Sequence, residues 1–364
     1  MAKVIFYPIG NADGTLIEFA DGQLLLKDYC NRKDTKDNND KRVDLSAELR
    51  TVLEEKDRDY IDVVAFSHCD DDHVGDAESF FWFEHAKEYQ GDNRIKIKEL
   101  WVPACFILEE GLKNSARIIR QEARYRLINN KGIRVFGNPN ILNEWLKENG
   151  IDPKERDSLI THAGEVLNFN NAELFVHSPF SFKMKDEDVD RNGACLVFHI
   201  TFVEGGTSTR LMLGSDLEYE SWNNVIIKTR QRENSERLIW DIFRISHHCS
   251  YTALSSEKGK EKTEPTELIK SLFEKGEIGC YLISSSDPIP PKDTDQPPHR
   301  QAAAYYKEIA ANKKGEFMVT MEEPNQYSPK PIKIEITNRG HRRLLAGAAA
   351  VIPAKISRAS EKQG

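Results

Sequence analysis

The stretch Ser67-His68-Cys69-Asp70-Asp71-Asp72-His73 decides the fold of this chain. It directly follows the apolar run Ile61 to Phe66, which predicts a buried strand. A strand that ends in two histidines and three aspartates presents several metal ligands at one point. Carboxylate oxygens and imidazole nitrogens together suit Zn, Mn or Fe, and two adjacent ions can share such a cluster. The stretch therefore predicts a metal-dependent hydrolase whose other segments supply a bridging carboxylate and a further histidine.

A second apolar strand, Leu211-Met212-Leu213, runs through Gly214-Ser215 into Asp216. A carboxylate at this position can bridge two cations ~3.5–4 Å apart with its two oxygens. Taken alone, Asp216 would more often be the N-cap of the helix that we expect over Leu217 to Thr229. Its place after an apolar strand favours the ligand interpretation.

Paired histidines end a third apolar strand, in Phe243-Arg244-Ile245-Ser246-His247-His248. Because adjacent residues on a strand point to opposite faces, one histidine can bind metal while the other faces the substrate. We favour His247 as the ligand and His248 as its catalytic neighbour. His299, in the segment Asp295-Gln296-Pro297-Pro298-His299, is a further catalytic candidate, although a Pro-Pro-His sequence also suits a plain turn.

The composition is that of a soluble globular protein, with 39% hydrophobic and 30% charged residues among 364. No run of ~18 apolar residues exists, so we expect no membrane span. Six scattered cysteines without CxxC spacing fit reduced thiols and favour a cytoplasmic location. The net charge of −8 argues against indiscriminate binding of polyanions by the whole surface.

Strand-like segments fall into two groups, each interleaved with helical ones, which predicts two sheets packed face to face with helices outside. We expect one domain over residues 1–340, with a helical insertion at about 104–160. Residues 341–364 are basic and rich in alanine, and we expect them to form a disordered tail.

These motifs in this order resemble the metallo-β-lactamase superfamily. Asp70, where most members have histidine, resembles the hydrolase domain of ComEC-type DNA-uptake proteins and its free-standing soluble relatives. The turn Pro8-Ile9-Gly10-Asn11-Ala12-Asp13 and the segment Asp190-Arg191-Asn192-Gly193 are similar to that branch as well. The chain departs from the pattern at Cys249 and at Gly75-Asp76, where glycines are usual.

The resemblance implies an αββα sandwich, of mixed α/β class, with two divalent ions, Zn or Mn. In the superfamily pattern His68 and Asp70 hold one ion, Asp72 and His73 hold the other, Asp216 bridges them, and His247 or His248 completes the second site. It implies a phosphodiesterase or nuclease that acts on nucleic acid through a metal-bridging hydroxide, with Asp72, His248 and His299 as catalytic residues. A protein partner is possible, but nothing in the chain specifies one.

Two other functions stay open. The chain could be a small-molecule hydrolase of the same fold, acting on a small phosphodiester, lactone or lactam, or a non-catalytic metal-binding interaction module. Five basic residues would discriminate: Lys113, Arg117, Arg120, Arg124 and Arg126. Such a set is usually a solvated helix face, whereas a nuclease could use it to follow the phosphate backbone.

Overall fold

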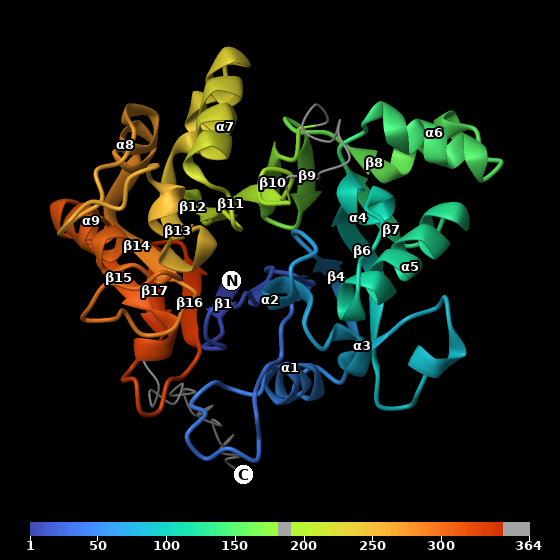
Figure 1. Cartoon of the computed structure of the whole chain (residues 1–364), viewed down its shortest axis with the longest axis horizontal. Helices are drawn as coiled ribbons and strands as arrows, with labels where there is room; N and C mark the ends of the chain where they lie inside the picture. The colour runs from blue at the N-terminus through green and yellow to red at the C-terminus, as the bar shows by residue number, and fades with distance from the viewer. Residues whose placement is uncertain (181–190, 345–364) are drawn as a thin grey trace, which may run out of the picture.

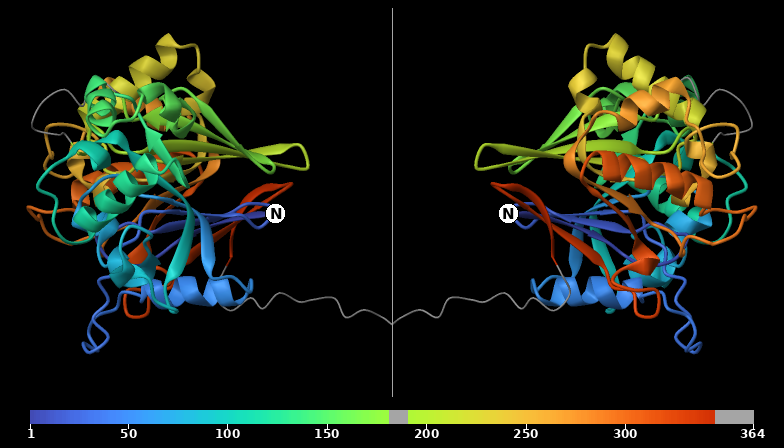
Figure 2. Two further views of the ribbon diagram at one scale, coloured as in Figure 1. Left: turned by 90° about the vertical axis from the view of Figure 1, so that its right-hand side faces the viewer. Right: turned by 90° about the vertical axis from the view of Figure 1, so that its left-hand side faces the viewer.

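The computed structural model describes residues 1–180 and 191–344. Their strands form two sheets. Sheet 1 has the order β17-β16-β1-β2-β3-β4-β6-β7-β8, with β5 paired to β6, and sheet 2 has the order β15-β14-β13-β12-β11-β10-β9. Figure 2 shows the two sheets stacked, with α1 below one and α7 above the other.

The strands of sheet 1 are β1 (Ala2–Phe6), β2 (Thr15–Glu18), β3 (Leu24–Lys27), β4 (Tyr60–Ala65), β5 (Phe81–Trp82), β6 (Ile95–Pro103), β7 (Ile133–Phe136), β8 (Ile160–Thr161), β16 (Ile332–Thr337) and β17 (Gly340–Leu344). Those of sheet 2 are β9 (Val166–Phe169), β10 (Ala172–Ser178), β11 (Val197–Glu204), β12 (Thr207–Leu213), β13 (Trp240–Arg244), β14 (Gly276–Ser284) and β15 (Glu316–Val319). The α-helices are α1 (Leu45–Glu54), α2 (Asp71–Val74), α3 (Ala77–Phe80), α4 (Ala104–Leu108), α5 (Asn114–Ile128), α6 (Asn140–Glu148), α7 (Tyr219–Gln231), α8 (Glu267–Phe273) and α9 (Arg300–Asn312).

Side-chain alternation along the strands builds four layers. In β12, Leu211 and Leu213 point into the core between the sheets, whereas Met212 packs against α7, α8 and α9 on the other face. In β3, Leu25 enters the same central core, and its neighbours face α1 and the helices α3 to α6. The predicted αββα sandwich is therefore confirmed, and Figure 1 shows the two groups of helices on opposite sides.

The strand directions bring the predicted motifs to one edge. β3, β4 and β6 are parallel neighbours in sheet 1, and β12 to β15 are parallel in sheet 2. The carboxyl ends of parallel strands meet at one edge of a sheet. Ser67–His73 follows β4, Asp216 follows β12, and the paired histidines follow β13, so these motifs converge.

Two local predictions need correction. The sequence from Gly75 to Tyr89 favours a single helix, but the structure has only the short α-helix α3 there, because the backbone becomes extended at Phe81 (φ −88°, ψ 150°) and continues as β5. The residues 104–160 are not purely helical, since β7 pairs in parallel with β6 and extends sheet 1. Their status as an insertion stays a prediction.

The predicted tail boundary at residue 341 falls inside β17, which pairs with β16. Residues 345–364, the rest of that predicted tail, lie outside the described residues. All six cysteines are unpaired, as their scattered spacing predicts, and all six are buried. Among the helices of the described ranges, none combines the length and the apolar character that crossing a membrane requires.

Candidate metal centre

The turn between β4 and α2 is held by the end of β3. The Asp28 carboxylate accepts hydrogen bonds from the Ser67 backbone N–H (2.6 Å) and from the Ser67 hydroxyl (2.8 Å). Helix α2 begins immediately afterwards, with Asp70 as its N-cap residue. Asp72 and His73 therefore project from the first turn of a short helix whose start is anchored to the neighbouring strand.

The other two segments come from sheet 2. Gly214 lets the end of β12 approach the next strand closely, because a Cβ there would meet Ser246 Oγ and the Trp222 ring. After β13 the backbone turns sharply, with positive φ at His247, His248 and Cys249. This turn re-aims the histidine pair, so the alternation expected for a strand does not apply to it.

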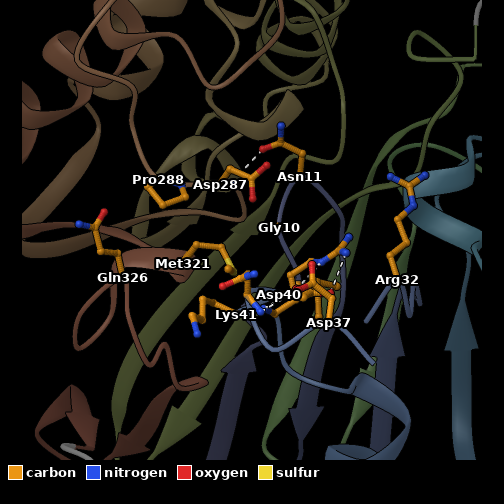
Figure 3. A pocket seen from close by; sticks show the side chains of 13 residues that line it. Gly10, Asn11, Arg32, Asp37, Asp40, Lys41, Asp287, Pro288, Met321 and Gln326 are labelled. Atoms are coloured by element: carbon orange, nitrogen blue, oxygen red, sulfur yellow. Dashed lines mark hydrogen bonds and ion pairs between the residues drawn. The ribbon is translucent and has the colours of Figure 1, made fainter. Parts of the chain in front are cut away.

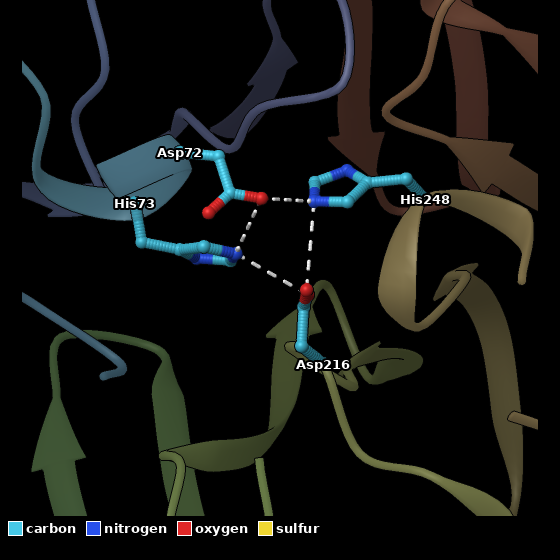
Figure 4. Close-up of side chains that lie close together, drawn as sticks. All are labelled: Asp72, His73, Asp216 and His248. Atoms are coloured by element: carbon cyan, nitrogen blue, oxygen red, sulfur yellow. Dashed lines mark hydrogen bonds and ion pairs between the residues drawn. The ribbon is translucent and has the colours of Figure 1, made fainter. Parts of the chain in front are cut away.

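Four side chains converge at this edge: Asp72, His73, Asp216 and His248 (Figure 4). Their ligand atoms all lie within 4.8 Å of one another. Nε2 of His248 lies 2.9 Å from Asp72 Oδ2 and 3.5 Å from Asp216 Oδ2, and Nε2 of His73 lies 3.3 Å from Asp216 Oδ1. All but Asp72 are buried.

The donor set of this cluster fits a divalent cation. Nε2 of His73 and Oδ1 of Asp216 are buried and face each other at 3.3 Å, and neither makes a hydrogen bond of good geometry to another described residue. Burial opposes ionisation of Asp216, but the neighbouring His73 and His248 hold its pKa well below its usual range. Burial likewise opposes protonation of His73, yet the carboxylates of Asp216 and Asp28 raise its pKa well above normal. The cluster thus favours positive charge at the point where its unpaired atoms meet.

A buried layer of charges orients the two histidines. Nδ1–H of His73 donates to Asp28 Oδ2 (3.0 Å), which also contacts Lys27 Nζ (2.9 Å). Nδ1–H of His248 donates to the Ser285 carbonyl (2.7 Å). Because Nδ1 of each ring is held by an acceptor outside the cluster, Nε2 is the ring nitrogen that faces the cluster.

A second group of acidic and imidazole side chains, Asp13, Asp28 and His73, lies beneath the first. Lys27 pairs with Asp28, and Arg244 pairs with Asp13 and donates to the Ser215 carbonyl (2.7 Å). With its carboxylates already matched by buried cations, this group supports the cluster above it and is not a second cation site.

His68 and Asp70 lie beside the four-residue cluster and are not part of it. Nε2 of His68 is buried without a hydrogen-bond partner among the described residues, and it lies 3.6 Å from Asp70 Oδ2. The rings of His68 and His73 are 3.9 Å apart. The other oxygen of Asp70 accepts from Arg191 Nη1 at 2.6 Å.

The two histidines of the pair lie in the opposite positions to those expected, with His248 and not His247 at the cluster. His248 enters the cluster, whereas Nδ1 of His247 lies 3.3 Å from the Thr252 hydroxyl and 3.7 Å from Glu218 Oε1. Glu218, and not Asp216, is the N-cap residue of α7, so Asp216 is free for the cluster. The ligand roles of these residues stay predictions.

His299 also lies outside the four-residue cluster. Its Nδ1 accepts from the Tyr251 backbone N–H (3.3 Å), and its Nε2 is buried without a partner among the described residues. Its catalytic role likewise stays a prediction.

Sequence reasoning assigned no role to the cations of the site. Lys27 ends the otherwise apolar β3, and Arg244 ends β13, in which Asp241 is the one other charged residue. A charge at the end of a buried strand is unusual and is the signal that points to buried partners. Arg191 carries no such signal, because its partners Asp70 and Glu109 are distant in the chain.

No protein-family model and no curated protein matches the chain. Similar solved structures include the metallo-β-lactamase fold protein YhfI from Bacillus subtilis, with 13% identity and a TM-score of 0.42 over 91% of this chain and 98% of that one. CmlA, a diiron β-hydroxylase from Streptomyces venezuelae, has 12% identity and a TM-score of 0.44 over 87% of this chain and 52% of its own. A long form RNase Z from yeast has 9% identity and a TM-score of 0.37 over 96% and 50%. The chain thus spans about half the length of the last two.

These identities and TM-scores describe similarity alone. The fold is defined by its four layers and by the strand ends at which the candidate ligands lie. The described chain is an αββα sandwich with a candidate metal centre where the ends of strands from its two sheets meet.

Proposed function

We propose that this protein is a metal-dependent phosphodiesterase that hydrolyses nucleic acid. The observation that carries the hydrolase part is the buried cluster of two carboxylates and two imidazoles with unpaired atoms aimed at one point. The nucleic-acid part is supported by the likeness of the Ser67–His73 motif to the ComEC-type branch.

The proposed ligand set takes His248 in place of His247. Asp72, His73, Asp216 and His248 would hold one ion, and His68 and Asp70 would serve a second ion that shares Asp216. Carboxylate and imidazole donors without thiolate suit Zn or Mn. Divalent ions held here would supply Lewis acidity, lowering the pKa of water and stabilising charge on the substrate oxygens.

The chain's own residues prepare this chemistry. Asp28 and the Ser285 carbonyl fix the orientation of the two imidazoles, so no reorganisation is needed when the centre forms. His299 accepts a hydrogen bond at Nδ1, so its Nε2 carries the proton in the neutral ring. A leaving-group oxygen that reached this Nε2–H could take its proton, which is the catalytic role proposed for His299.

The test is metal content by elemental analysis on a preparation assayed with single-stranded DNA, double-stranded DNA and bis-p-nitrophenyl phosphate, with and without Mn. We expect Asp72→Ala and Asp216→Ala each to lower hydrolysis to below about 1% of the parent while the fold persists, because each removes a metal ligand. Asp59→Ala, an exposed aspartate at the opposite end of β4, is the matched control and should retain activity. Full activity in either ligand variant contradicts the assignment.

The same assay separates the alternatives. Turnover of only the small diester would favour a small-molecule phosphodiesterase. Bound metal without turnover, with ligand variants that unfold, would favour the metal-binding interaction module.

A further inference from the structure

Three of the five basic residues around α5 serve the fold. Arg120 and Arg124 both pair with Glu110, at 2.8 and 2.7 Å. Arg126 is buried and pairs with Glu122 at 2.6 Å. These guanidinium groups are occupied, so they do not form a strip along which a phosphate backbone could run.

Lys113 differs from them. Its side chain lines a pocket of about 300 Å³ together with Arg191, Asp70 and Asp71. Among the described residues, its ammonium group has no carboxylate within ion-pair distance. The two carboxylates of the pocket already hold arginines, since Asp70 pairs with Arg191 and Asp71 with Arg32. The charge of Lys113 is therefore uncompensated within this lining.

Arg191 retains hydrogen-bonding capacity toward the same pocket. A guanidinium group has five N–H donors. Nε and Nη2 of Arg191 donate to Glu109 Oε1 at 2.9 and 2.5 Å, and Nη1 donates once to Asp70. Two donors remain, on a side chain that is 40% exposed and held in place from two sides. A guanidinium group that is fixed in place and partly exposed can donate these hydrogen bonds to phosphate oxygens.

The pocket adjoins the candidate metal centre through Asp70, whose second oxygen lies 3.6 Å from Nε2 of His68. A strand bound at the centre would reach this pocket past Asp70. A larger pocket of about 580 Å³ includes none of the predicted metal ligands in its lining (Figure 3). There Asp40 holds Arg42 through both of its oxygens, and Asp287 adds a further carboxylate beside it.

We propose that the Lys113–Arg191 pocket binds a phosphate of a nucleic-acid strand that flanks the phosphodiester at the metal centre. The proposal rests on the proposed function for the position of the scissile group. It identifies Lys113 and Arg191 as residues that discriminate a strand with flanking phosphates from a small diester.

The experiment measures equilibrium binding of a fluorescein-labelled single-stranded oligonucleotide by anisotropy, with chelator-treated protein so that no turnover consumes the probe. Affinity is followed against salt concentration. Removing one phosphate contact lowers the slope of log K against log salt by about 0.7 for a single strand. We expect this drop for Lys113→Gln and for Arg191→Gln.

Arg117→Gln is the matched control, because Arg117 lies one turn further along α5, carries the same charge and is not among the residues that line the pocket. Its slope should equal that of the parent. Lys113 is exposed, so its variant tests the pocket even if Arg191→Gln fails to fold. With metal restored, the ratio of kcat/KM for the oligonucleotide to that for bis-p-nitrophenyl phosphate should fall about 10-fold in Lys113→Gln.

Three results would contradict the pocket assignment, and one would contradict the proposed function. An equal loss of slope in Arg117→Gln, no loss in Lys113→Gln, or a parent that does not bind the oligonucleotide would overturn the pocket assignment. A parent that binds with the expected slopes but hydrolyses neither substrate would support the pocket and refute the proposed function instead.

Discussion

Asp28 is the residue on which the orientation of His73 depends. It is fully buried, and it joins His73 Nδ1, the Lys27 ammonium and the Ser67 hydroxyl at one carboxylate. Burial opposes its ionisation, but Lys27 and His73 hold the pKa of Asp28 well below its usual range. A negative charge at this point keeps Nδ1–H of His73 directed at Asp28 and so turns Nε2 toward the cluster.

The substitution Asp28→Asn should lower metal affinity about 10–100-fold, because an amide no longer fixes the His73 ring as a carboxylate does. It should also destabilise the fold, since Lys27 is left as a buried unpaired cation. Isothermal titration with Zn measures the first effect, and urea unfolding measures the second.

The double variant Lys27→Met with Asp28→Asn separates the two effects. Removing the unpaired cation should recover much of the stability while metal affinity stays low. If metal affinity recovered with stability, Asp28 would act on the fold alone and not on His73.

Strands β10 and β11 are fastened to their surroundings by two buried histidines. His177 contacts Thr229 of α7 (3.1 Å) and the Arg237 carbonyl (3.0 Å), and His199 contacts the Ile239 carbonyl (2.8 Å). Burial lowers the pKa of His177 to about 3 and that of His199 to about 4. Both imidazoles are therefore neutral in the folded protein at neutral pH.

Acid should weaken this part of the fold. Since both pKa values are lower in the folded chain than the unfolded value of 6.5, protonation favours the unfolded state. Their contribution to stability is complete above about pH 6.5 and is lost as the pH falls toward 4. Each histidine adds a slope of up to about 1.4 kcal/mol per pH unit.

Urea unfolding of chelator-treated protein between pH 7.5 and 4.5 checks this. The double variant His177→Gln with His199→Gln should show a shallower loss of stability below pH 6.5 than the parent. Parallel curves for the two proteins would exclude these histidines as the source of acid sensitivity.

At the scale of the whole molecule, the candidate metal centre links the two sheets. Asp72 and His73 follow a strand of sheet 1, and Asp216 and His248 follow strands of sheet 2. An ion bound by all four would hold the two sheets together at the edge where their strands end. Metal binding is thereby coupled to the stability of the complete sandwich.

Metal should consequently raise the melting temperature. An ion present at 100 times its Kd stabilises the folded state by about 2.7 kcal/mol, which corresponds to roughly 2–4 °C for a chain of this size. Differential scanning calorimetry with Zn or Mn against a chelator measures the shift. Asp216→Ala should show no such rise in melting temperature. If neither metal raised the melting temperature of the parent, the coupling between metal binding and stability would be contradicted.

Several features could be predicted from the sequence because they are local. Apolar alternation predicts the strands, and parallel order brings their carboxyl ends to one edge, so Asp72, His73 and Asp216 meet as their positions after β4 and β12 indicate. The αββα class follows from the same alternation, since each sheet must bury both faces.

Other features were decided only by tertiary structure. Three consecutive residues with positive φ bring His248, rather than His247, to the cluster, and this turn is set by the packing of β12 against β13. The pairing of Arg191 with Asp70 joins residues 121 positions apart. Glu110 forms ion pairs with Arg120 and Arg124, which the helix pattern alone would place on a solvated face. The alternation that predicts a strand depends only on neighbouring residues. The partner of a charged side chain depends instead on which distant segment the fold brings beside it.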